Sequence, residues 1–552
     1  MRLSHENSDS PKAGHGPMAP VSGATPLAAV PPAESTRDSI RVNSRQHRDV
    51  LADCTQALRQ WNAQEPCLFT RGDAIVQIVE VDGHPQIRPL NFSDMRKVMS
   101  KAADFFVAAE AGGNPENGRL IPTEPPAVFV QDMLHSRREL DFPDLIGVSE
   151  LPFLRPDGSI VEERGYDPVS RLYYAPSPDL EIAPMPTRPD RQDAIEAIEQ
   201  VVDVLREFPW VGVSLVNALG LLLTIIVRHV ISQSQSSSHS ETHGCVPLFL
   251  MNAPKPGNGK GLLTDVICLI CTGTPAPMRA QPERNADEFR KSITSALTAG
   301  RSIIVWDNLE GTLKSPALAA AITTESWSDR PLGRTADVTL PQRSTFIVTG
   351  NNIILGGDLA RRCVPIKLDA NSSRPWAGRT FTYPNLKQHV MENRGKLVRA
   401  LLIIASAWYR AGRPEPKNSP ILGSFEDWSR TIGGILEFCG YAGFLGNCEE
   451  LYENSDPAEQ EWAAYLGALY DGFDDDEFTV AQLVRLHSFE SNPVAEAMPA
   501  DIQKIKDNSK SIGRAFLSRV RTRYGAEGLY LEKVSEPGER VARWRVRSGN
   551  DS

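Results

Sequence analysis

The chain has few of the features that mark secreted, zinc-binding or membrane proteins. Its eight cysteines in 552 residues include no CxxC…CxxC arrangement of the kind that binds zinc. The closely spaced pair, Cys268 and Cys271, falls in a segment that we expect to be helical, where this spacing places both thiols on one buried face. Unpaired cysteines and the lack of a signal peptide predict a reducing, cytoplasmic location.

An excess of positive charge is also lacking. The 59 Lys and Arg residues are outnumbered by 69 Asp and Glu, which gives a net charge of −10 at pH 7. A protein with this balance is not a general nucleic-acid coat, so any contact with DNA must come from a local basic patch. Hydrophobic residues make up 41% of the chain, enough for two to four domains.

Long hydrophobic runs are scarce. The exception is 210–227, WVGVSLVNALGLLLTIIV, which approaches the lower length limit of a membrane-spanning helix. It contains Ser214 and Asn217 and leads within a short distance into another apolar segment. We expect a buried helix and no membrane association; a single membrane span is the alternative.

The most informative motif that is present is VPLFLMNAPKPGNGKGLL, residues 246–263. An apolar strand, a Pro/Gly turn, a lysine and a second apolar run are typical of a phosphate-binding loop, with Lys260 directed at the β- and γ-phosphates of ATP. Pro254 and Gly261 replace the first glycine and the final Ser/Thr of GxxxxGK[ST], so an ordinary turn is the alternative. The expected nucleotide contacts are Pro256, Gly257, Asn258, Gly259, Lys260, Gly261 and Leu262.

Further apolar strands follow this loop at even spacing. The strand SIIVWDN ends in Asp307, 47 residues after Lys260 (307 − 260), and STFIVTGNN brings Asn351 44 residues later (351 − 307). Arg361 and Arg362 then precede a fourth strand at 364–368. A carboxylate at the carboxyl edge of a parallel sheet can hold Mg²⁺ beside phosphates. The series predicts an α/β P-loop core, and four unrelated buried strands are the alternative.

Composition and periodicity divide the rest of the chain. The expected parts are a disordered tail over 1–48, a small α+β domain over 49–180, a helical linker over 181–245, the ATPase core over 246–415, a helical segment over 416–470 and a C-terminal domain over 471–552.

The C-terminal domain differs from the rest in charge. Residues 501–552 contain twelve Lys and Arg against seven Asp and Glu, a local net charge of +5 (12 − 7). A strand and helix, a helix over 511–524 and a final hairpin predict a winged helix that binds DNA through Arg519, Arg521 and Arg523. A solvated charged face on a protein-binding module is the alternative.

These motifs resemble the helicase-type AAA+ ATPases of phages, plasmids and genomic islands, which are related to superfamily 3 and include primase C-terminal and replicative helicases. The resemblance covers about 190–450 and rests on KPGNGKGLL, IIVWDNLEG, ESWSDRPLG, FIVTGNNIILGGDLARR and RPWAGRTF with ENRGKLVRALL. It implies an AAA+ fold, ATP and Mg²⁺ as cofactors, DNA binding and a homo-oligomer, expected to be a hexamer. A primase or other replication proteins are further expected partners.

The resemblance also implies roles for single residues. Lys260 of the Walker A block binds phosphate, and Asp307 of Walker B holds Mg²⁺. Asn351, the sensor 1 residue, positions the attacking water. Either Arg361 or Arg362 reaches the γ-phosphate of a neighbouring subunit.

The chain departs from the family pattern at two points. Asn308 stands where the family carries the glutamate that activates water, and an amide can orient a water but cannot accept its proton. Glu310 is the nearest carboxylate, so the identity of the base stays open. Gly261 removes the usual hydroxyl ligand of Mg²⁺ unless Thr264 or water takes its place.

Arg330 and Arg334 occupy the position of a DNA-contacting hairpin in the family; a salt bridge between subunits is the alternative. The sequence thus predicts an ATP-dependent DNA helicase or translocase that serves replication of a mobile element. Two alternatives remain: a non-helicase, ATP-switched initiator or loader on DNA, and a defence or regulatory ATPase.

Overall fold

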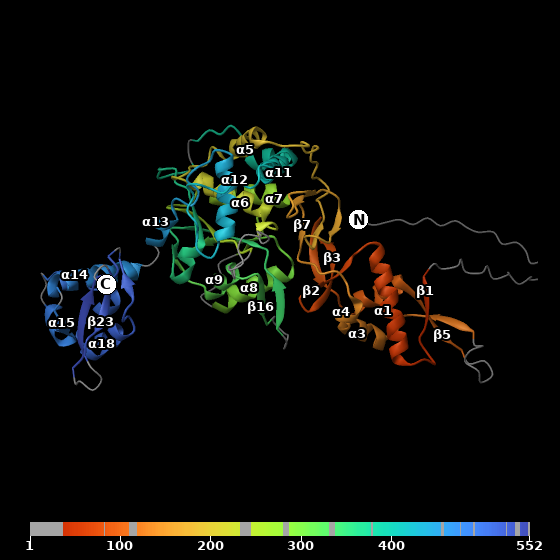
Figure 1. Cartoon of the computed structure of the whole chain (residues 1–552), viewed down its shortest axis with the longest axis horizontal. Helices are drawn as coiled ribbons and strands as arrows, with labels where there is room; N and C mark the ends of the chain where they lie inside the picture. The colour runs from red at the N-terminus through yellow and green to blue at the C-terminus, as the bar shows by residue number, and fades with distance from the viewer. Residues whose placement is uncertain are drawn as a thin grey trace, which may run out of the picture.

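The computed structural model shows a mixed α/β protein with parallel and antiparallel sheets (Figure 1). It describes residues 37–81, 83–109, 119–231, 244–279, 286–330, 337–376, 379–453, 457–474, 476–488, 492–525, 527–535 and 541–549. Residues 1–36 of the expected tail lie outside these ranges.

A five-stranded parallel sheet forms the centre of the largest unit. Across the sheet its strands are β13 (Met278–Arg279), β14 (Ile303–Leu309), β18 (Thr345–Asn351), β12 (Leu248–Ala253) and β20 (Cys363–Lys367). All neighbours run parallel. Parallel strands need crossover connections: α7 (Lys260–Thr272) lies in the connection from β12 to β13, and α8 (Ala286–Thr298) in the connection from β13 to its neighbour β14. Because β18 lies between β12 and β14, the carboxyl ends of these three strands meet at one edge.

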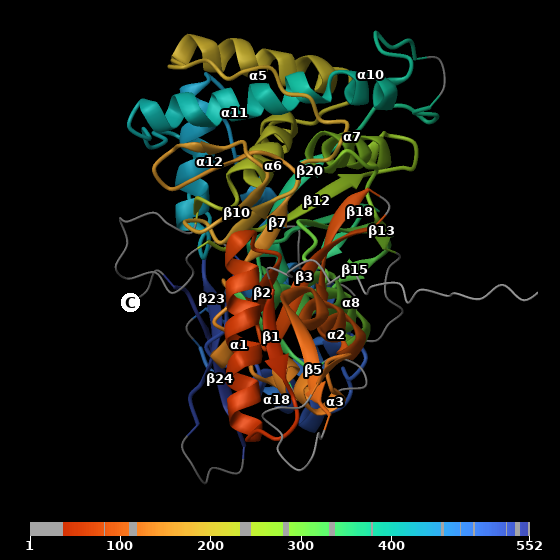
Figure 2. The ribbon, with the colours of Figure 1, turned by 90° about the vertical axis from the view of Figure 1, so that its right-hand side faces the viewer.

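Helices cover this sheet and bury its apolar strands. Those not yet given are α5 (Arg191–Leu205), α6 (Ser214–Val227), α9 (Pro316–Ile322), α10 (Leu386–Glu392), α11 (Arg394–Arg410), α12 (Glu426–Phe438) and α13 (Cys448–Glu453). Figure 2 shows α5 and α11 running side by side across one end of the unit, where they contact each other closely.

Helix α6 is the apolar segment that could have been read as a membrane span. It lies in the core, with Leu221 and Leu222 fully buried. Its polar side chains have partners inside the protein: Asn217 Nδ2 donates to Pro365 O over 2.8 Å, and Thr224 Oγ1 accepts from Trp428 Nε1 over 2.8 Å. Throughout the described ranges, no helix has the length and apolar character to cross a membrane.

The N-terminal unit combines helices with small sheets. Its elements are β1 (Asp38–Arg41), α1 (His47–Gln64), β2 (Leu68–Arg71), β3 (Ala74–Val81), β4 (His84–Pro89), α2 (Phe92–Ala102), β5 (Ala103–Ala108), β6 (Leu120–Thr123), α3 (Ala127–His135) and α4 (Arg137–Leu140). Short strands follow: β7 (Gly147–Ser149), β8 (Phe153–Leu154), β9 (Ile160–Val161), β10 (Gly165–Asp167) and β11 (Leu172–Tyr174).

The expected tail over 1–48 is too long at its C-terminal end. Strand β1 pairs in parallel with β5, and α1 begins at His47. The reason is Ile40, which is 1% exposed and belongs to the core of the N-terminal unit. One apolar side chain in a polar segment was too weak a periodic signal to reveal a strand.

The C-terminal unit packs helices on a four-stranded antiparallel sheet. The sheet order is β21 (Phe478–Thr479), β24 (Arg543–Arg547), β23 (Leu529–Lys533) and β22 (Arg523–Tyr524). The helices are α14 (Pro457–Phe473), α15 (Val480–Leu486), α16 (Pro493–Glu496), α17 (Ala500–Gln503) and α18 (Ser509–Leu517).

Two boundaries in this region differ from those expected. Helix α14 supplies Trp462 and Tyr465 to the C-terminal core, so this unit begins near 457 rather than 471. The basic helix expected over 511–524 ends at Leu517. Arg521 has a φ of +63°, a left-handed conformation that no α-helix accommodates, and its N–H donates to Leu531 O over 3.0 Å. The pattern of basic side chains in the sequence did not indicate that the helix ends before Arg521.

All eight cysteines are free thiols. Cys268 and Cys271 are buried in α7, as expected, and burial raises the pKa of Cys271 to about 12. Cys67 is the exposed one, and Cys448 is half-buried.

Candidate nucleotide site and nucleic-acid interface

The loop over 254–259 joins the end of β12 to the start of α7. Gly257 and Gly259 have φ values of +88° and +94°, which L side chains rarely adopt. A Cβ on Gly257 would also lie 2.7 Å from a ring atom of Trp376. The N–H groups of the first turn of α7 have no acceptor within the helix, so this loop ends at the positive pole of a helix.

The other loop residues differ in what their side chains do. Asn258 is 1% exposed and fixes the loop: Nδ2 donates to Lys255 O over 2.9 Å, and Oδ1 accepts from Ala370 N over 2.7 Å. Pro256 is exposed, and Leu262 is 38% exposed. Of the expected contact set, Asn258 therefore has its side chain engaged within the protein.

Lys260 opens α7 and points at the carboxyl edge of the sheet. Its side chain is mostly buried, and Nζ donates to Asn351 Oδ1 over 2.7 Å. Burial lowers the Lys260 pKa, while the charge of Asp307 acts in the opposite direction. The three residues expected at the phosphates and the metal thus meet at one place, brought there by β12, β18 and β14.

Asp307 is oriented by a residue that the sequence reading missed. Thr349 Oγ1 donates to Asp307 Oδ1 over 2.5 Å and accepts from Asn308 N over 3.0 Å. The register of β14 against β18 shifts between Trp306 and Leu309, and Asn308 has a φ of +53°. This bulge turns the end of β14 toward the edge. The available signal was a threonine in the otherwise apolar segment FIVTGN.

The water-activating base is not singled out by geometry. Asn308 and Glu310 are both exposed at the end of β14. Thr264 is fully buried with its hydroxyl 2.9 Å from Lys260 O, so it faces the interior and not the loop surface. Within the described residues, no group of three or more His, Cys, Asp or Glu could hold a metal. A single carboxylate, that of Asp307, would suit Mg²⁺ only if phosphate oxygens and water supplied its other ligands.

Arg361 and Arg362 lie at the end of a 3₁₀ helix, η3 (Gly357–Arg362), and both pair with Asp358. Arg362 also donates to Ala319 O over 2.6 Å and to Thr323 Oγ1 over 2.8 Å, and its side chain is 15% exposed. The Arg361 side chain is 58% exposed. Arg362 is therefore engaged in contacts within the chain, whereas the Arg361 side chain is largely exposed.

The arginines expected at DNA fall on a β-hairpin and on the C-terminal unit. Strands β16 (Ser326–Asp329) and β17 (Val338–Pro341) pair antiparallel, and the exposed Arg330 begins the connection between them. Arg334 lies outside the described residues. The hairpin is anchored on α8, where Trp327 Nε1 donates to Thr294 Oγ1 over 2.9 Å.

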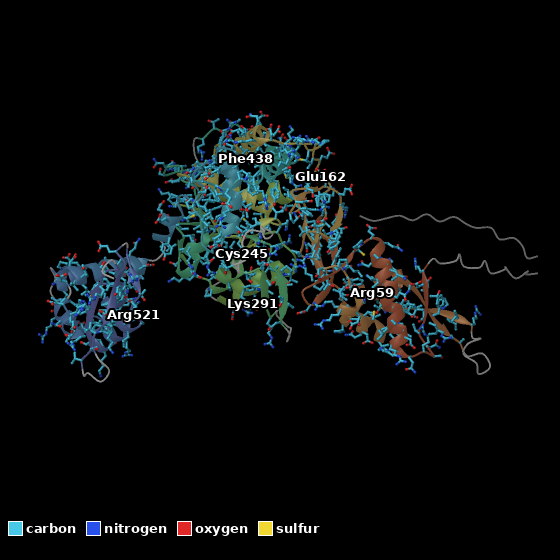
Figure 3. The ribbon with its side chains drawn as sticks, viewed as in Figure 1. Arg59, Glu162, Cys245, Lys291, Phe438 and Arg521 are labelled. Atoms are coloured by element: carbon cyan, nitrogen blue, oxygen red, sulfur yellow. The ribbon has the colours of Figure 1, made fainter. Side chains whose placement is uncertain are left out.

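On the C-terminal unit the three expected arginines differ. Arg519 Nη2 lies 2.7 Å from Asp501 Oδ2, and its guanidinium covers the Trp462 ring at 4.4 Å. Arg521 and Arg523 are exposed (Figure 3 labels Arg521). Arg519 thus holds α14 to the rest of the unit, and the other two arginines remain at the surface.

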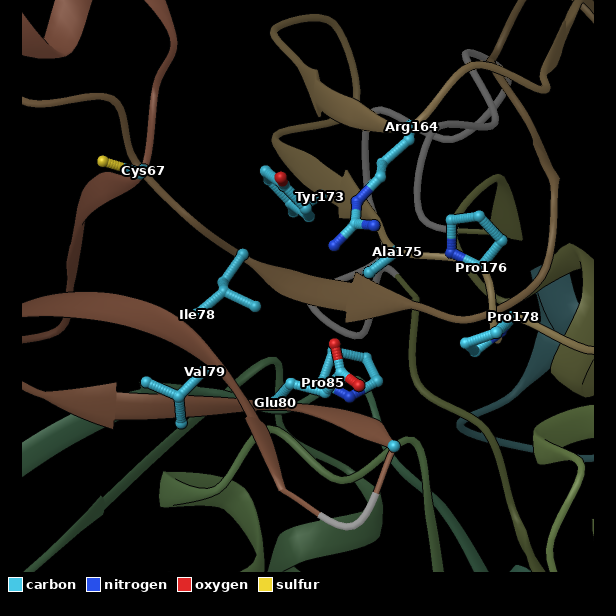
Figure 4. A pocket seen from close by; sticks show the side chains of 11 residues that line it. Cys67, Ile78, Val79, Glu80, Pro85, Arg164, Tyr173, Ala175, Pro176 and Pro178 are labelled. Atoms are coloured by element: carbon cyan, nitrogen blue, oxygen red, sulfur yellow. The ribbon is translucent and has the colours of Figure 1, made fainter.

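A separate hollow lies in the N-terminal unit. It measures about 110 Å³ and is lined by residues that include Glu80, Arg164 and Tyr173, with Cys67 at its rim (Figure 4). None of the expected site residues lines it.

No family model and no curated protein matches the chain. Among solved structures, two apo structures of the NrS-1 C-terminal region (A form) are similar over 89% of this chain and 98% or 99% of theirs, at 11% identity and TM-scores of 0.37 and 0.39. At this identity and score the likeness assigns neither a family nor an activity, so function has to be argued from the geometry of the site.

Proposed function

We propose that the protein is an ATP-hydrolysing motor that acts on DNA, with an AAA+ P-loop core. The observation that carries this proposal is the convergence of Lys260, Asn351 and Asp307 at the carboxyl edge of a parallel sheet, beside a glycine loop that opens a helix. Ligands of α/β proteins bind at this edge of the sheet.

The electrostatics of Lys260 fit a phosphate ligand. Asn351 accepts a hydrogen bond from one of the three N–H groups of the Lys260 ammonium group, which leaves two N–H groups for phosphate oxygens. Burial disfavours the charged form of Lys260, and the negative charge of a bound phosphate would stabilise it. Phosphoryl transfer depends mainly on such positioning and charge stabilisation. Mg²⁺, held by Asp307, would neutralise further charge on the phosphates.

The order of the strands supports the same function. With β18 between the loop strand β12 and the acidic strand β14, Asn351 reaches Lys260 from one side while Thr349 orients Asp307 on the other. A water held by Asn351 would therefore lie between the phosphate loop and the acid. Asn308 can orient that water but cannot take its proton.

We also propose a homo-oligomer, with the hexamer taken from the resemblance to AAA+ helicases, and Arg361 supports it. Its exposed guanidinium, at the end of η3, suits a site completed by a neighbouring subunit, and Arg362 holds η3 against α9. DNA contact is proposed for Arg330 on the β16–β17 hairpin and for the exposed Arg521 and Arg523 of the C-terminal unit, interpreted as a winged helix. Replication of a mobile element is the proposed role.

A second candidate is an initiator or loader that is switched by ATP and does not unwind DNA. It is favoured by Asn308 at the position of the catalytic glutamate, since a site without a base hydrolyses ATP slowly.

Strand displacement on a forked DNA, measured with and without ATP in parallel with phosphate release, separates these candidates. A motor releases phosphate and displaces the strand, and both activities are lost in Lys260→Ala. ATP-dependent DNA binding without displacement would identify the switch. If wild-type protein neither binds nor hydrolyses ATP, both candidates are wrong.

A further inference from the structure

A small cavity lies at the opposite edge of the central sheet from the phosphate loop. It measures about 20 Å³, and its lining includes Arg71, His229, Arg301 and Arg343. Arg71 ends β2 of the N-terminal unit, while Ser302 and Ser344, also in the lining, precede β14 and β18. We call this feature the arginine cavity. It forms where the N-terminal unit meets the amino ends of the core strands.

Arg71 has no ion-pair partner among the residues that the structure describes. It is 5% exposed, and its Nε atom is buried without a partner. Nowhere in the described ranges does its guanidinium make a hydrogen bond or an ion pair, and burial alone lowers its pKa to about 10. A guanidinium does not give up its proton in a protein, so Arg71 is a buried, unpaired cation.

Other arginines near Arg71 increase the excess of positive charge. Arg343 is largely buried and lies 3.8 Å from Glu325, and burial lowers its pKa. Arg228 is 2% exposed, and burial together with repulsion from Arg343 lowers its pKa to about 9. Glu150 lines an adjacent cavity together with Arg301, and its carboxylate is hydrogen-bonded to His84 Nδ1 at 2.6 Å.

His229 adds a group of a different kind. Burial and the adjacent arginines lower the His229 pKa to about 3, so its imidazole is neutral at pH 7 and can donate one N–H without adding charge. The cavity lining therefore contains three arginines, a neutral imidazole and no carboxylate. Isolated charges are buried only when a partner compensates them.

We propose that the arginine cavity binds a phosphate group. Arginine forks match the oxygens of a tetrahedral phosphate with paired, charge-assisted hydrogen bonds. A space of 20 Å³ holds little more than one water-sized group, so it admits phosphate oxygens from its open side but not a nucleotide. The phosphate is therefore either free or part of a nucleic-acid backbone, and the chemistry of recognition is the same.

The hairpin proposed to contact DNA reaches this cavity. Its second strand, β17, ends at Pro341 in the cavity lining, and Thr339 O packs so closely on Gly72 that a Cβ there would lie 2.2 Å away. Gly72 directly follows Arg71. Arg330 and the arginine cavity thus lie at two ends of one hairpin. The nucleic-acid source of the phosphate rests on the proposed function, whereas phosphate binding itself does not.

The first measurement is thermal unfolding in increasing inorganic phosphate, against chloride at equal ionic strength. All variants carry Lys260→Met, so that the phosphate loop does not contribute. The test variants are Arg71→Gln and Arg343→Gln, and the control is Arg48→Gln, whose side chain is 85% exposed on α1.

We expect phosphate to raise the melting temperature of the parent and of Arg48→Gln. The rise should be at least halved in Arg71→Gln, while that variant melts no lower than the parent in phosphate-free buffer. An arginine with a purely structural role would instead lower stability there. The proposal is wrong if Arg71→Gln and Arg343→Gln keep the full rise, or if chloride stabilises the parent as much as phosphate.

The second measurement identifies the source of the phosphate. Binding of a labelled oligothymidylate is followed by anisotropy over a range of salt concentrations. If a backbone phosphate is bound, Arg71→Gln should reduce the slope of log K against log salt by about 0.7, the value for one contact on a single strand. An unchanged slope together with a lost phosphate response assigns the cavity to free phosphate. Neither readout needs ATP hydrolysis, so a failure of the proposed ATPase would appear separately in phosphate release by the wild type.

Discussion

Replacing Lys260 by methionine should separate the stability of the protein from its affinity for ATP. Methionine has nearly the same length and fills the same mostly buried space, but it carries no charge. In the unliganded protein the change removes a charged hydrogen bond to Asn351, which contributes about 1.5–3 kcal/mol. It also removes the cost of burying an ammonium group, which is in general several kcal/mol per ion; the lowered Lys260 pKa has the direction that this cost predicts.

The two effects have opposite signs, so the free energy of unfolding should change by no more than about 1 kcal/mol. The lowered pKa shows that folding disfavours the charged form of Lys260. Methionine lacks this penalty, and the stability gained in that way offsets the stability lost with the hydrogen bond. ATP, in contrast, loses the cation at its β- and γ-phosphates. Truncating a buried charged partner costs about 2–4 kcal/mol, which corresponds to roughly 30- to 700-fold weaker binding.

The assay is calorimetric titration with ATP and Mg²⁺, accompanied by thermal unfolding of the unliganded protein. Lys255→Met is the matched control, because Lys255 is exposed in the same loop and loses the same charge. We expect the control to bind ATP within about twofold of wild type, since an exposed charge contributes little. Equal ATP affinity of Lys260→Met and wild type would refute the assignment of the loop, and equal losses in both lysine variants would reduce it to a net-charge effect.

Three further outcomes are expected. Thr349→Val should lower the rate of ATP hydrolysis about 10-fold or more while ATP affinity changes little, because it frees Asp307 without touching the phosphate loop; loss of affinity without loss of turnover would contradict this. Arg362→Ala should lower the melting temperature, whereas Arg361→Ala should reduce hydrolysis at unchanged stability and regain activity when mixed with a Lys260→Ala subunit; no recovery in confirmed mixed assemblies would point to a role within one subunit. Arg519→Glu should destabilise the C-terminal unit by about 1–3 kcal/mol, because it loses the contacts with Asp501 and Trp462. Arg521→Glu should weaken DNA binding while the C-terminal unit stays folded. Equal melting temperatures of the two variants would refute this distinction.

The core of the site was accessible from the sequence because its determinants are local. A glycine loop, an acid at the end of one apolar strand and an amide at the end of another need only one assumption, that parallel strands share an edge. Lys260, Asp307 and Asn351 do meet at one edge of the sheet. Their catalytic roles stay predictions until nucleotide turnover is measured.

What the sequence could not reveal are contacts between distant segments. Trp376 lies against Gly257 and is 67% exposed. The sequence around Trp376 gives no indication of this contact. Arg71 meets Arg301 and Arg343 across two units, and each is an ordinary charged residue in its own segment. Side-chain periodicity shows which face is buried, but not which core buries it.

The C-terminal boundary was misplaced for the same reason. Helix α14 has an apolar face that would suit either neighbouring core, and it packs with Phe516 and Trp544. A cut after Tyr470, inside this helix, would therefore divide the C-terminal core and unfold it. A truncation meant to test DNA binding should leave out the whole helix, ending before Pro457.

The distribution of the thiols makes this chain unusually easy to label. Seven of the eight cysteines are fully or partly shielded, so a maleimide dye added under native conditions should attach at Cys67. Partial desolvation of the otherwise exposed thiol and the nearby Glu65 raise the Cys67 pKa, and the reaction should therefore accelerate as the pH is raised above neutrality. Cys67 directly precedes β2, the strand that ends at Arg71, so a single dye on the unmodified protein would sit at the opposite end of this strand from the arginine cavity, without any engineered site.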